Sequence, residues 1–477
     1  MNPNLSDLLS EARRLDHGGQ KDMALAAYAQ YLETETHDAG AWSAYGGLLV
    51  DAGRWEEACR ACEQSLQLDK NNYSGLVHSA CAMVHQGLLA EAEGRLRHAI
   101  TIQPAHLGAR LILSDCLIQK GALDQARLLL DEIIEKQPDH LPALNRLNSL
   151  YVRQADWPHL RRDMERQLQG FSGPEADYRR SHLSLLFGDM PLGWQQFESR
   201  LQVPGRILSQ RQFHQPRWRG EAFPGKTLLI LWEQGFGDTL MFVRFASKVK
   251  ALGGRVLLEV QPHLADLVAT CPGVDEVIPH GSALPPFDLH VPLLSLPSVF
   301  QTELTSIPAD IPYLDIPESV PNREWIREAL APSVGRTRVG LVWAGNPDHQ
   351  RDSKRSLPPT ALSPLSELPW VAWHSFQLGT EELPLLPGIV SLAPFISNFS
   401  DTAYALSGMD LIITVDTALA HLAGALGIPT FLLISFIPDW RWLMGRADTP
   451  WYPTMQIFRQ PSPGDWGAVV QQILTSL

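Results

Sequence analysis

The apolar and small positions of the first 170 residues recur at a fixed spacing. Three series repeat every 34 residues or so, about the length of one helix pair, and the segments between them show the three- and four-residue apolar spacing of amphipathic helices. The series are Gly19, Gly53, Gly87 and Gly121; Ala24, Ala58, Ala92 and Ala126; and Pro104 with Pro138. We interpret each glycine as a turn between two helices and each alanine as a point of close helix approach. Such pairs predict an all-α solenoid with a concave face over residues 1–170.

This array resembles the tetratricopeptide repeat, in which a small residue fills the turn and an alanine follows five residues later. Trp42 occupies the family's usual aromatic position, and the pattern extends over residues 5–141. Residues 142–170 depart from it, because Ala155 replaces the turn glycine and Leu160 the alanine, as is typical of a capping repeat. The resemblance implies a concave face that binds an acceptor polypeptide. A scaffold or homodimerisation module without peptide specificity is the alternative.

The pattern changes after residue 170. Residues 171–224 continue a helical period and end in a polar, aromatic, proline-bearing stretch, which we interpret as a helical connector. Short apolar runs then alternate with helical stretches in two blocks, 225–325 and 335–477, which predicts a parallel sheet in each. The expected strands are 226–233, 255–260, 274–279 and 288–291 in the first block and 338–343, 371–376, 389–392, 411–415 and 430–434 in the second. We therefore expect a multidomain chain with an α/β region of two Rossmann-like lobes. The last helix of the chain either stays with the second lobe or crosses back to the first.

The stretch 410–434 carries the clearest candidate chemistry. An apolar strand ends at Asp416 and Thr417, and a helix of small residues that carries His421 follows. Ligands of parallel sheets bind at the carboxyl ends of strands, and the N–H groups that open the helix suit a phosphate. Thr417 and His421 lie one helical turn apart, so we expect both to face one crevice. A helix-capping Asp416 with a packed His421 is an interpretation that stays equally open.

The first strand of the first lobe ends in the turn 235–239, which contains Gly237 and Asp238. The third glycine of a dinucleotide fingerprint is absent, so we do not expect NAD. The glycines of this turn allow the backbone to approach a bound group closely. Asp238 is expected at the rim of the crevice as a ligand or a catalytic group. Alternatively, Asp238 and Thr239 only cap the following helix.

A loop over residues 344–356 follows the first strand of the second lobe. It contains Asn346 and three cations, Arg351, Lys354 and Arg355. In a chain this acidic, a local group of cations after a buried strand predicts a phosphate clamp. A solvated run of charges is the alternative.

Composition limits these interpretations. The net charge of −13 argues against non-specific nucleic-acid binding, and 45% hydrophobic residues are typical of a globular protein. The pair Cys59-x-x-Cys62 lies in a helical pattern without a partner pair, so we expect buried thiols. The N-terminus lacks the pattern of a secretory signal and no apolar run is long enough to span a membrane, so a cytoplasmic location is expected.

Two nucleotide-binding lobes in tandem resemble the GT-B glycosyltransferases. Four motifs sharpen the resemblance, and together they are similar to bacterial proteins that join tetratricopeptide repeats to a domain related to the heptosyltransferases of glycosyltransferase family 9, flagellin glycosyltransferases among them. The motifs are Glu233-Gln234-Gly235-Phe236-Gly237-Asp238-Thr239, Trp343-x-Gly345-Asn346-Pro347-x-His349-x-x-Asp352-x-x-Arg355-Ser356, Ser375-Phe376-Gln377-Leu378 and Asp416-Thr417-x-x-x-His421-Leu422-Ala423.

The resemblance implies a role for each of these positions. Asp238 matches the general base of the family. Lys354 and Arg355 match the residues that hold the donor phosphate. The implied donor-binding set is Gly237, Asn346, Lys354, Arg355, Ser375, Gln377, Asp416, Thr417 and His421, with Ser375 and Gln377 lining the nucleoside pocket. The chain departs from the family in a short first lobe and in Phe236 and Met241, which stand where smaller or more polar residues are expected near a lipid-sugar acceptor.

We therefore expect a glycosyltransferase that moves a sugar from a nucleotide-sugar donor to a Ser or Thr hydroxyl of a protein, with flagellin as one candidate acceptor. No Asp-x-Asp motif is present in the sequence, so we expect neither a metal nor another cofactor. Helix N–H groups and the cationic loop would stabilise the leaving phosphate. The alternatives are an inactive scaffold that senses a nucleotide sugar, a nucleotide-sugar epimerase and a lipopolysaccharide sugar transferase.

Overall fold

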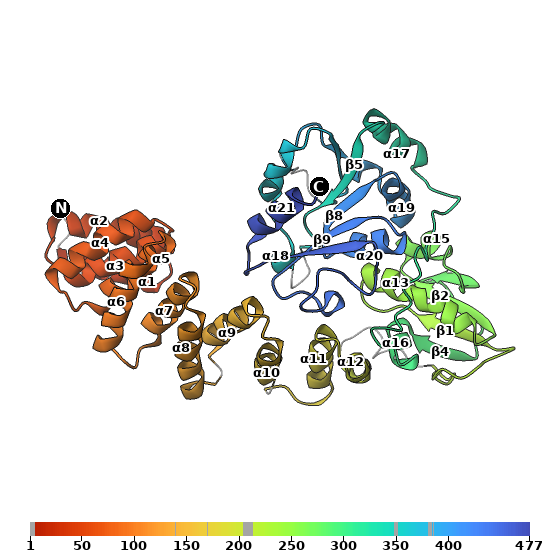
Figure 1. Cartoon of the computed structure of the whole chain (residues 1–477), viewed down its shortest axis with the longest axis horizontal. Helices are drawn as coiled ribbons and strands as arrows, with labels where there is room; N and C mark the ends of the chain where they lie inside the picture. The colour runs from red at the N-terminus through yellow and green to blue at the C-terminus, as the bar shows by residue number, and fades with distance from the viewer. Residues whose placement is uncertain are drawn as a thin grey trace. The chain divides into compact units, whose positions relative to one another are not determined.

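A computed structural model of the chain describes residues 5–138, 140–168, 170–203, 213–347, 352–379, 384 and 386–477. The chain divides into two compact units, Met1–Asp163 and Met164–Leu477. Figure 1 shows the first unit as helices only and the two parallel sheets within the second.

The first unit is a stack of helix pairs. Helix α1 packs on α2, α3 on α4, α5 on α6 and α7 on α8, and each pair contacts the next one along the chain. The helices are α1 (Leu5–His17), α2 (Lys21–Thr34), α3 (Ala39–Asp51), α4 (Trp55–Leu68), α5 (Tyr73–His85), α6 (Leu89–Ile102), α7 (Leu107–Gln119), α8 (Leu123–Lys136), α9 (Leu141–Arg153) and α10 (Trp157–Gln167). Contacts limited to near neighbours are the mark of a solenoid, as the sequence predicted.

The repeat series have the physical basis that their spacing suggested. The four turn glycines take left-handed φ angles of 70–78°, a conformation that side chains other than glycine rarely adopt, and Ala155 takes the same turn at φ 53°. The four series alanines and Leu160 are fully buried between helices. Of the two cysteines expected to be buried, Cys62 is, and burial raises the pKa of its thiol to about 12, whereas Cys59 is partly exposed.

The second unit begins with the helices expected as a connector. They are α11 (Gly173–Leu186), α12 (Met190–Phe197) and the 3-10 helix η1 (Glu198–Gln202). Trp194 is buried in the same hydrophobic core as both sheets, and its indole Nε1 donates to the Thr302 carbonyl at 3.0 Å. Arg200 forms a buried two-pronged ion pair with Glu233, just after the first strand, at 2.9 and 2.6 Å. These helices are therefore part of the α/β unit.

The first lobe contains a four-stranded sheet in the order β3-β2-β1-β4, with all neighbours parallel. Its elements are β1 (Thr227–Leu231), α13 (Phe236–Phe242), η3 (Val243–Phe245), α14 (Ala246–Lys250), β2 (Arg255–Val260), η4 (Pro262–Leu264), α15 (Ala265–Val268), β3 (Glu276–Pro279), β4 (Leu289–Pro292), η5 (Leu293–Ser295) and α16 (Leu296–Val299). The sequence predicted a turn over residues 235–239. Helix α13 begins at Phe236 instead, which places Gly237 and Asp238 in its first turn.

The second lobe contains a six-stranded parallel sheet in the order β10-β9-β8-β5-β6-β7. The direction of strand addition reverses between β5 and β8, and crevices at such reversals are where α/β sheets bind ligands. Its elements are α17 (Arg323–Leu330), η6 (Ala331–Ser333), β5 (Thr337–Val342), α18 (Asp352–Arg355), η7 (Pro359–Glu367), β6 (Val371–Ser375), β7 (Val390–Ser391), η8 (Ala393–Phe395), α19 (Phe399–Ser407), β8 (Leu411–Val415), α20 (Ala418–Ala425), β9 (Thr430–Ile434), η9 (Trp440–Trp442), β10 (Met455–Arg459) and α21 (Trp466–Leu474).

The two lobes share one hydrophobic core. Helix α13 of the first lobe packs directly on α20 of the second. The buried Arg244 links them, because its guanidinium donates to the carbonyl of Trp451 at 2.6 Å and to the hydroxyl of Tyr313 at 2.8 Å. The last helix, α21, buries its apolar side against η7 and β10 of its own lobe, so the crossing to the first lobe is not seen among the described residues.

Candidate active site

The site lies where the turn after β1 meets the loops after β8 and β9. Asp238 comes from the first turn of α13, and its carboxylate accepts a hydrogen bond from the backbone N–H of Gly235 at 2.9 Å. The other oxygen of the carboxylate is ion-paired with the guanidinium of Arg441 from the second lobe. Asp238 therefore caps its helix, as one interpretation predicted, and it also contacts the opposite lobe. Its role as a ligand or a catalytic group stays a prediction.

Arg441 is the central cation of the site. It lies in η9, and its guanidinium also donates to the carboxylate of Asp439 at 2.6 Å and stacks 4.3 Å from the ring centroid of Trp440. Its side chain is 12% exposed. Burial opposes the charge of this guanidinium, but the neighbouring carboxylates outweigh burial and raise the pKa of Arg441 above its ordinary value.

Asp416 follows β8 at the reversal in strand order. Burial, and then the negative charge of Asp439, raise the pKa of Asp416 to about 6. Burial also acts to raise the pKa of Asp439, but its ion pair with Arg441 brings the value below that of an ordinary aspartate. The backbone carbonyl of Asp416 accepts a hydrogen bond from Arg355 Nη1 at 3.0 Å. Asp238, Asp416, Arg355 and Arg441 are therefore brought together in one place.

The cationic loop is fixed by its own hydrogen bonds. Arg355 Nε donates to Asp352 at 3.1 Å, and the Ser356 hydroxyl donates to the same carboxylate at 2.9 Å while accepting from the Gly345 N–H at 2.9 Å. A methyl group on Gly345 would lie 2.4 Å from Asp352 Oδ1 and 2.5 Å from the guanidinium of Arg355, so the glycine leaves room for both side chains as they are placed. Lys354 and Asn346 are exposed on the same loop. The predicted cation Arg351 lies outside the described residues, as does His349 of the motif.

Ser375 and Gln377 end β6 in the interior of the lobe. The side-chain oxygen of Gln377 accepts from the backbone N–H groups of Trp343 at 3.2 Å and Ala344 at 2.9 Å. Both side chains are buried. This amide therefore holds the carboxyl end of β5 in place, and its predicted contact with a nucleoside stays a prediction.

Thr417 and His421 lie at the start of α20 and within it. Thr417, and not Asp416, is the N-cap of α20, and its side chain makes no capping bond. His421 is enclosed: its Nδ1 is 2.9 Å from the hydroxyl of Tyr452, and its ring stacks on Trp442 with centroids 5.2 Å apart. Burial lowers the pKa of His421 well below its ordinary value. The expectation that both side chains face a crevice is wrong for His421, because aromatic rings and α13 cover it.

Gly237 explains how the lobes approach so closely. A methyl group at this position would lie 2.7 Å from Cδ2 of His421. The glycine thus serves the contact between α13 and α20, and the resemblance had assigned it to the donor. Phe236 beside it is 36% exposed and forms a ring pair with Phe399 of the second lobe at 5.0 Å.

Sequence reasoning missed Arg441 and Asp439, which the structure places at the centre. A signal was available, since both lie in the loop that follows the strand β9, at the same edge of the sheet as Asp416. Sequence could not show that Asp238, 203 residues away, supplies the other half of the ion pair.

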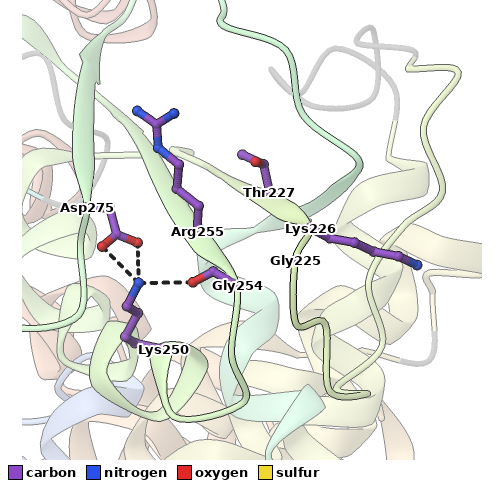
Figure 2. Close-up of a pocket in the computed structure, with 7 residues that line it drawn as sticks. All are labelled: Gly225, Lys226, Thr227, Lys250, Gly254, Arg255 and Asp275. Atoms are coloured by element: carbon purple, nitrogen blue, oxygen red, sulfur yellow. Dashed lines mark hydrogen bonds and ion pairs between the residues drawn. The ribbon is translucent and has the colours of Figure 1, made fainter.

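A separate hollow of about 380 Å³ lies in the first lobe (Figure 2). It is lined at the amino ends of β1 and β2, the edge of the sheet opposite to Asp238. Lys250 is held there by Asp275 at 2.6 Å and by the Gly254 carbonyl at 2.9 Å, and Arg255 is ion-paired with Glu276. Parallel sheets bind ligands at the other edge, so we assign the chemistry to the Asp238 site.

Among the described residues, no helix combines the length and apolar character that crossing a membrane requires. In the same residues, no group of three or more His, Cys, Asp or Glu side chains has the geometry to hold a metal ion.

Comparisons with known proteins support the repeat assignment. The tetratricopeptide repeat family matches residues 83–149. Protein FlbA of Caulobacter vibrioides is 25% identical over 441 residues, which cover 85% of this chain and 73% of FlbA. The Protein CTR9 homolog of Arabidopsis thaliana is 25% identical over 163 residues, which cover 34% of this chain and 15% of that protein.

Solved structures with some similarity include a tetratricopeptide repeat protein from Parabacteroides merdae and pilF from Pseudomonas aeruginosa. Each is 16% identical with a TM-score of 0.34 and covers 43% of this chain, and the match spans 80% and 95% of the respective structures. The family match, together with the turns and buried alanines, shows that the chain contains tetratricopeptide repeats ahead of an α/β region with two parallel sheets.

Proposed function

We propose that this protein is a glycosyltransferase that moves a sugar from a nucleotide-sugar donor to a Ser or Thr hydroxyl of a protein. One observation carries the proposal. A carboxylate of the first lobe, Asp238, meets a cationic residue of the second lobe, Arg441, at the carboxyl edges of two parallel sheets. That juxtaposition of an acceptor for a proton and a partner for a phosphate is what transfer from a nucleotide sugar requires.

The donor would bind mainly to the second lobe. Negative charge grows on the phosphates of the donor as the bond to the sugar breaks. Arg355 and Arg441 are the guanidinium groups that the site offers to this charge. Arginine suits this role because its planar fork matches phosphate oxygens. Asp238 would accept the proton of the attacking hydroxyl as the new bond to the sugar forms. Lys354, exposed on the same loop, is a further candidate for the phosphate.

The solenoid would present the protein acceptor. Stacked helix pairs expose a concave surface that suits an extended polypeptide, and flagellin stays one candidate on the basis of the family resemblance. The alignment with FlbA is long enough to include parts of both units of this chain. A homodimer through the repeats is the competing use of this surface.

A second function is favoured by a specific observation. The carboxylate of Asp238 is already bound by Arg441 and by the Gly235 N–H, and α13 covers the ring of His421. A protein that binds a nucleotide sugar without transferring it would have this closed arrangement. In that case the repeats would report the bound state to a partner.

Transfer assays separate the two functions. The purified chain would be incubated with UDP-, GDP-, CMP- and ADP-linked sugars and a co-expressed flagellin-like protein, and the intact mass of that protein would be measured. We expect a gain of one sugar mass, and Asp238→Ala should slow the transfer by about 100-fold or more. Asp266→Ala is the matched control, because Asp266 is an exposed carboxylate of the same lobe. Full activity of Asp238→Ala would remove this residue from the mechanism, and binding without mass gain by the wild type would favour the sensor.

A further inference from the structure

The proposed function leaves open how a donor reaches a cation that is already paired. We propose that Arg441 changes partners: in the free protein it holds Asp238, and the diphosphate of a donor takes the place of Asp238 on the guanidinium. This inference rests on the proposed function and adds to it a residue and a control step. It makes Asp238 an internal competitor of the donor as well as the acceptor of the proton.

The two carboxylates on Arg441 are attached in different ways. Asp439 lies two residues before Arg441, and it accepts both from the guanidinium at 2.6 Å and from the Arg441 backbone N–H at 3.2 Å. It therefore moves with the arginine and orients it. Asp238 comes from the other lobe, 203 residues away in the chain, and makes only the guanidinium contact with Arg441. Asp238 is the partner that a ligand can replace.

The charge of the site indicates that a diphosphate replaces Asp238 on Arg441 and does not simply join it there. Four carboxylates, those of Asp238, Asp352, Asp416 and Asp439, surround the two guanidinium groups of Arg355 and Arg441. A diphosphate that joined this set would meet an excess of negative charge at close range. Arg355 is held by Asp352 and by the Asp416 carbonyl, both within its own lobe. Loss of the Asp238 contact frees Arg441 from one of its two carboxylate partners. The contacts within the second lobe are kept.

The exchange links binding to the chemical step. While Asp238 is bound to Arg441, the guanidinium holds one oxygen of its carboxylate and the Gly235 N–H holds the other. When phosphate oxygens occupy the guanidinium, the carboxylate is released next to the reacting centre. The hydroxyl oxygen of the acceptor then bonds to the anomeric carbon, its proton passes to Asp238, and the sugar–phosphate bond breaks with its electron pair going to the nucleoside diphosphate.

A competitor built into the protein lowers apparent affinity, and its removal raises it. Asp238→Asn should therefore bind a nucleoside diphosphate more tightly than wild type, by about tenfold, because the binding-competent fraction rises. The asparagine side chain keeps an oxygen for the Gly235 N–H, so the cap of α13 is preserved. Arg441→Gln should bind about tenfold or more weakly. Adding Asp238→Asn to Arg441→Gln should change nothing further, since the competition acts through Arg441.

The test is isothermal titration of the full chain with UDP, GDP, CDP and ADP, with Asp266→Asn as the control expected to match wild type. Thermal unfolding checks each variant, and Arg441→Lys, which keeps the charge but loses the fork, replaces Arg441→Gln where the latter does not fold. Tighter binding by Asp238→Asn that disappears in the Arg441 background supports the inference. Equal or weaker binding by Asp238→Asn, or binding by none of the proteins, overturns it.

Failure of this inference is distinct from failure of the proposed function. If transfer to protein occurs and Asp238→Asn does not tighten diphosphate binding, the enzyme stands and the exchange of partners is wrong. If Asp238→Asn tightens binding but wild type transfers no sugar, the exchange stands and the protein is a nucleotide sensor.

Discussion

The pKa of Asp416 gives a quantitative test of the site. The pKa of an aspartate in an unfolded chain is about 3.9. In the folded protein, burial and the charge of Asp439 raise the pKa of Asp416 to about 6. The folded state therefore binds the proton more tightly than the unfolded state. The stability that this group contributes is fully present below about pH 4 and is lost as the pH rises through about 6.

The magnitude follows from the shift. A difference of about two pKa units corresponds to roughly 3 kcal/mol of unfolding free energy at pH 8. Asp416→Asn cannot ionise, so this variant should be more stable than wild type by up to about that amount at pH 8. The advantage should hold down to about pH 6, shrink below it, and vanish only below about pH 4, where the carboxyl becomes protonated in the unfolded state as well.

The measurement is differential scanning calorimetry of both proteins between pH 5 and pH 8. The solenoid and the α/β unit need not unfold together, and calorimetry resolves separate transitions. The quantity of interest is the difference between variant and wild type at each pH, because the other groups titrate in both. Asp266→Asn, at an exposed position of the same unit, should show a difference near zero throughout. A variant that is less stable at pH 8, or whose advantage does not depend on pH, would refute the reasoning.

Three further substitutions test the packing. Gly237→Ala places a methyl group 2.7 Å from His421 and should cost about 1–3 kcal/mol in chemical denaturation; a neutral result would mean that α13 can move away. Arg244→Leu removes the donor to the Trp451 carbonyl and should cost about 2–4 kcal/mol, since buried acceptors lose a charged partner; unchanged stability would remove this link between the lobes. Ala155→Gly relieves a left-handed turn at φ 53° and should stabilise the solenoid by up to about 1 kcal/mol, seen as a higher Tm; a lower Tm would contradict that strain.

Much of the fold follows from local pattern. The turn glycines, of which Gly53 is typical, had to be glycine because the chain takes a positive φ there, and that requirement is visible in sequence as a fixed spacing. The strand β8 is an apolar run that stops at Asp416, so its carboxyl end and the candidate residue could be read together. Element limits were not read correctly everywhere: α13 begins at Phe236, inside the predicted turn 235–239.

The site was only partly accessible to the same reasoning. Position after a strand predicted Asp238 and Asp416, and a local group of cations predicted Arg355. Arg441, which was not predicted, is ion-paired with Asp238 and lies near Asp416, whose carbonyl is bound by Arg355. The orientation of His421 was not predicted, because its environment is made by Tyr452 and by α13 from another lobe. Helical spacing fixes which side chains share a face, but it contains no information on what covers that face.

By itself, the sequence determined the repeated helix pairs, the parallel sheets and the residues at their strand ends, because these depend on backbone preference and on apolar spacing over a few residues. Only the tertiary structure decided that Arg441 is the cation at the centre and that it joins Asp439 to Asp238. An ion pair between residues 203 positions apart depends on how two sheets pack around a shared core. Such packing is a cooperative property of the whole unit, and no short stretch of the chain records it.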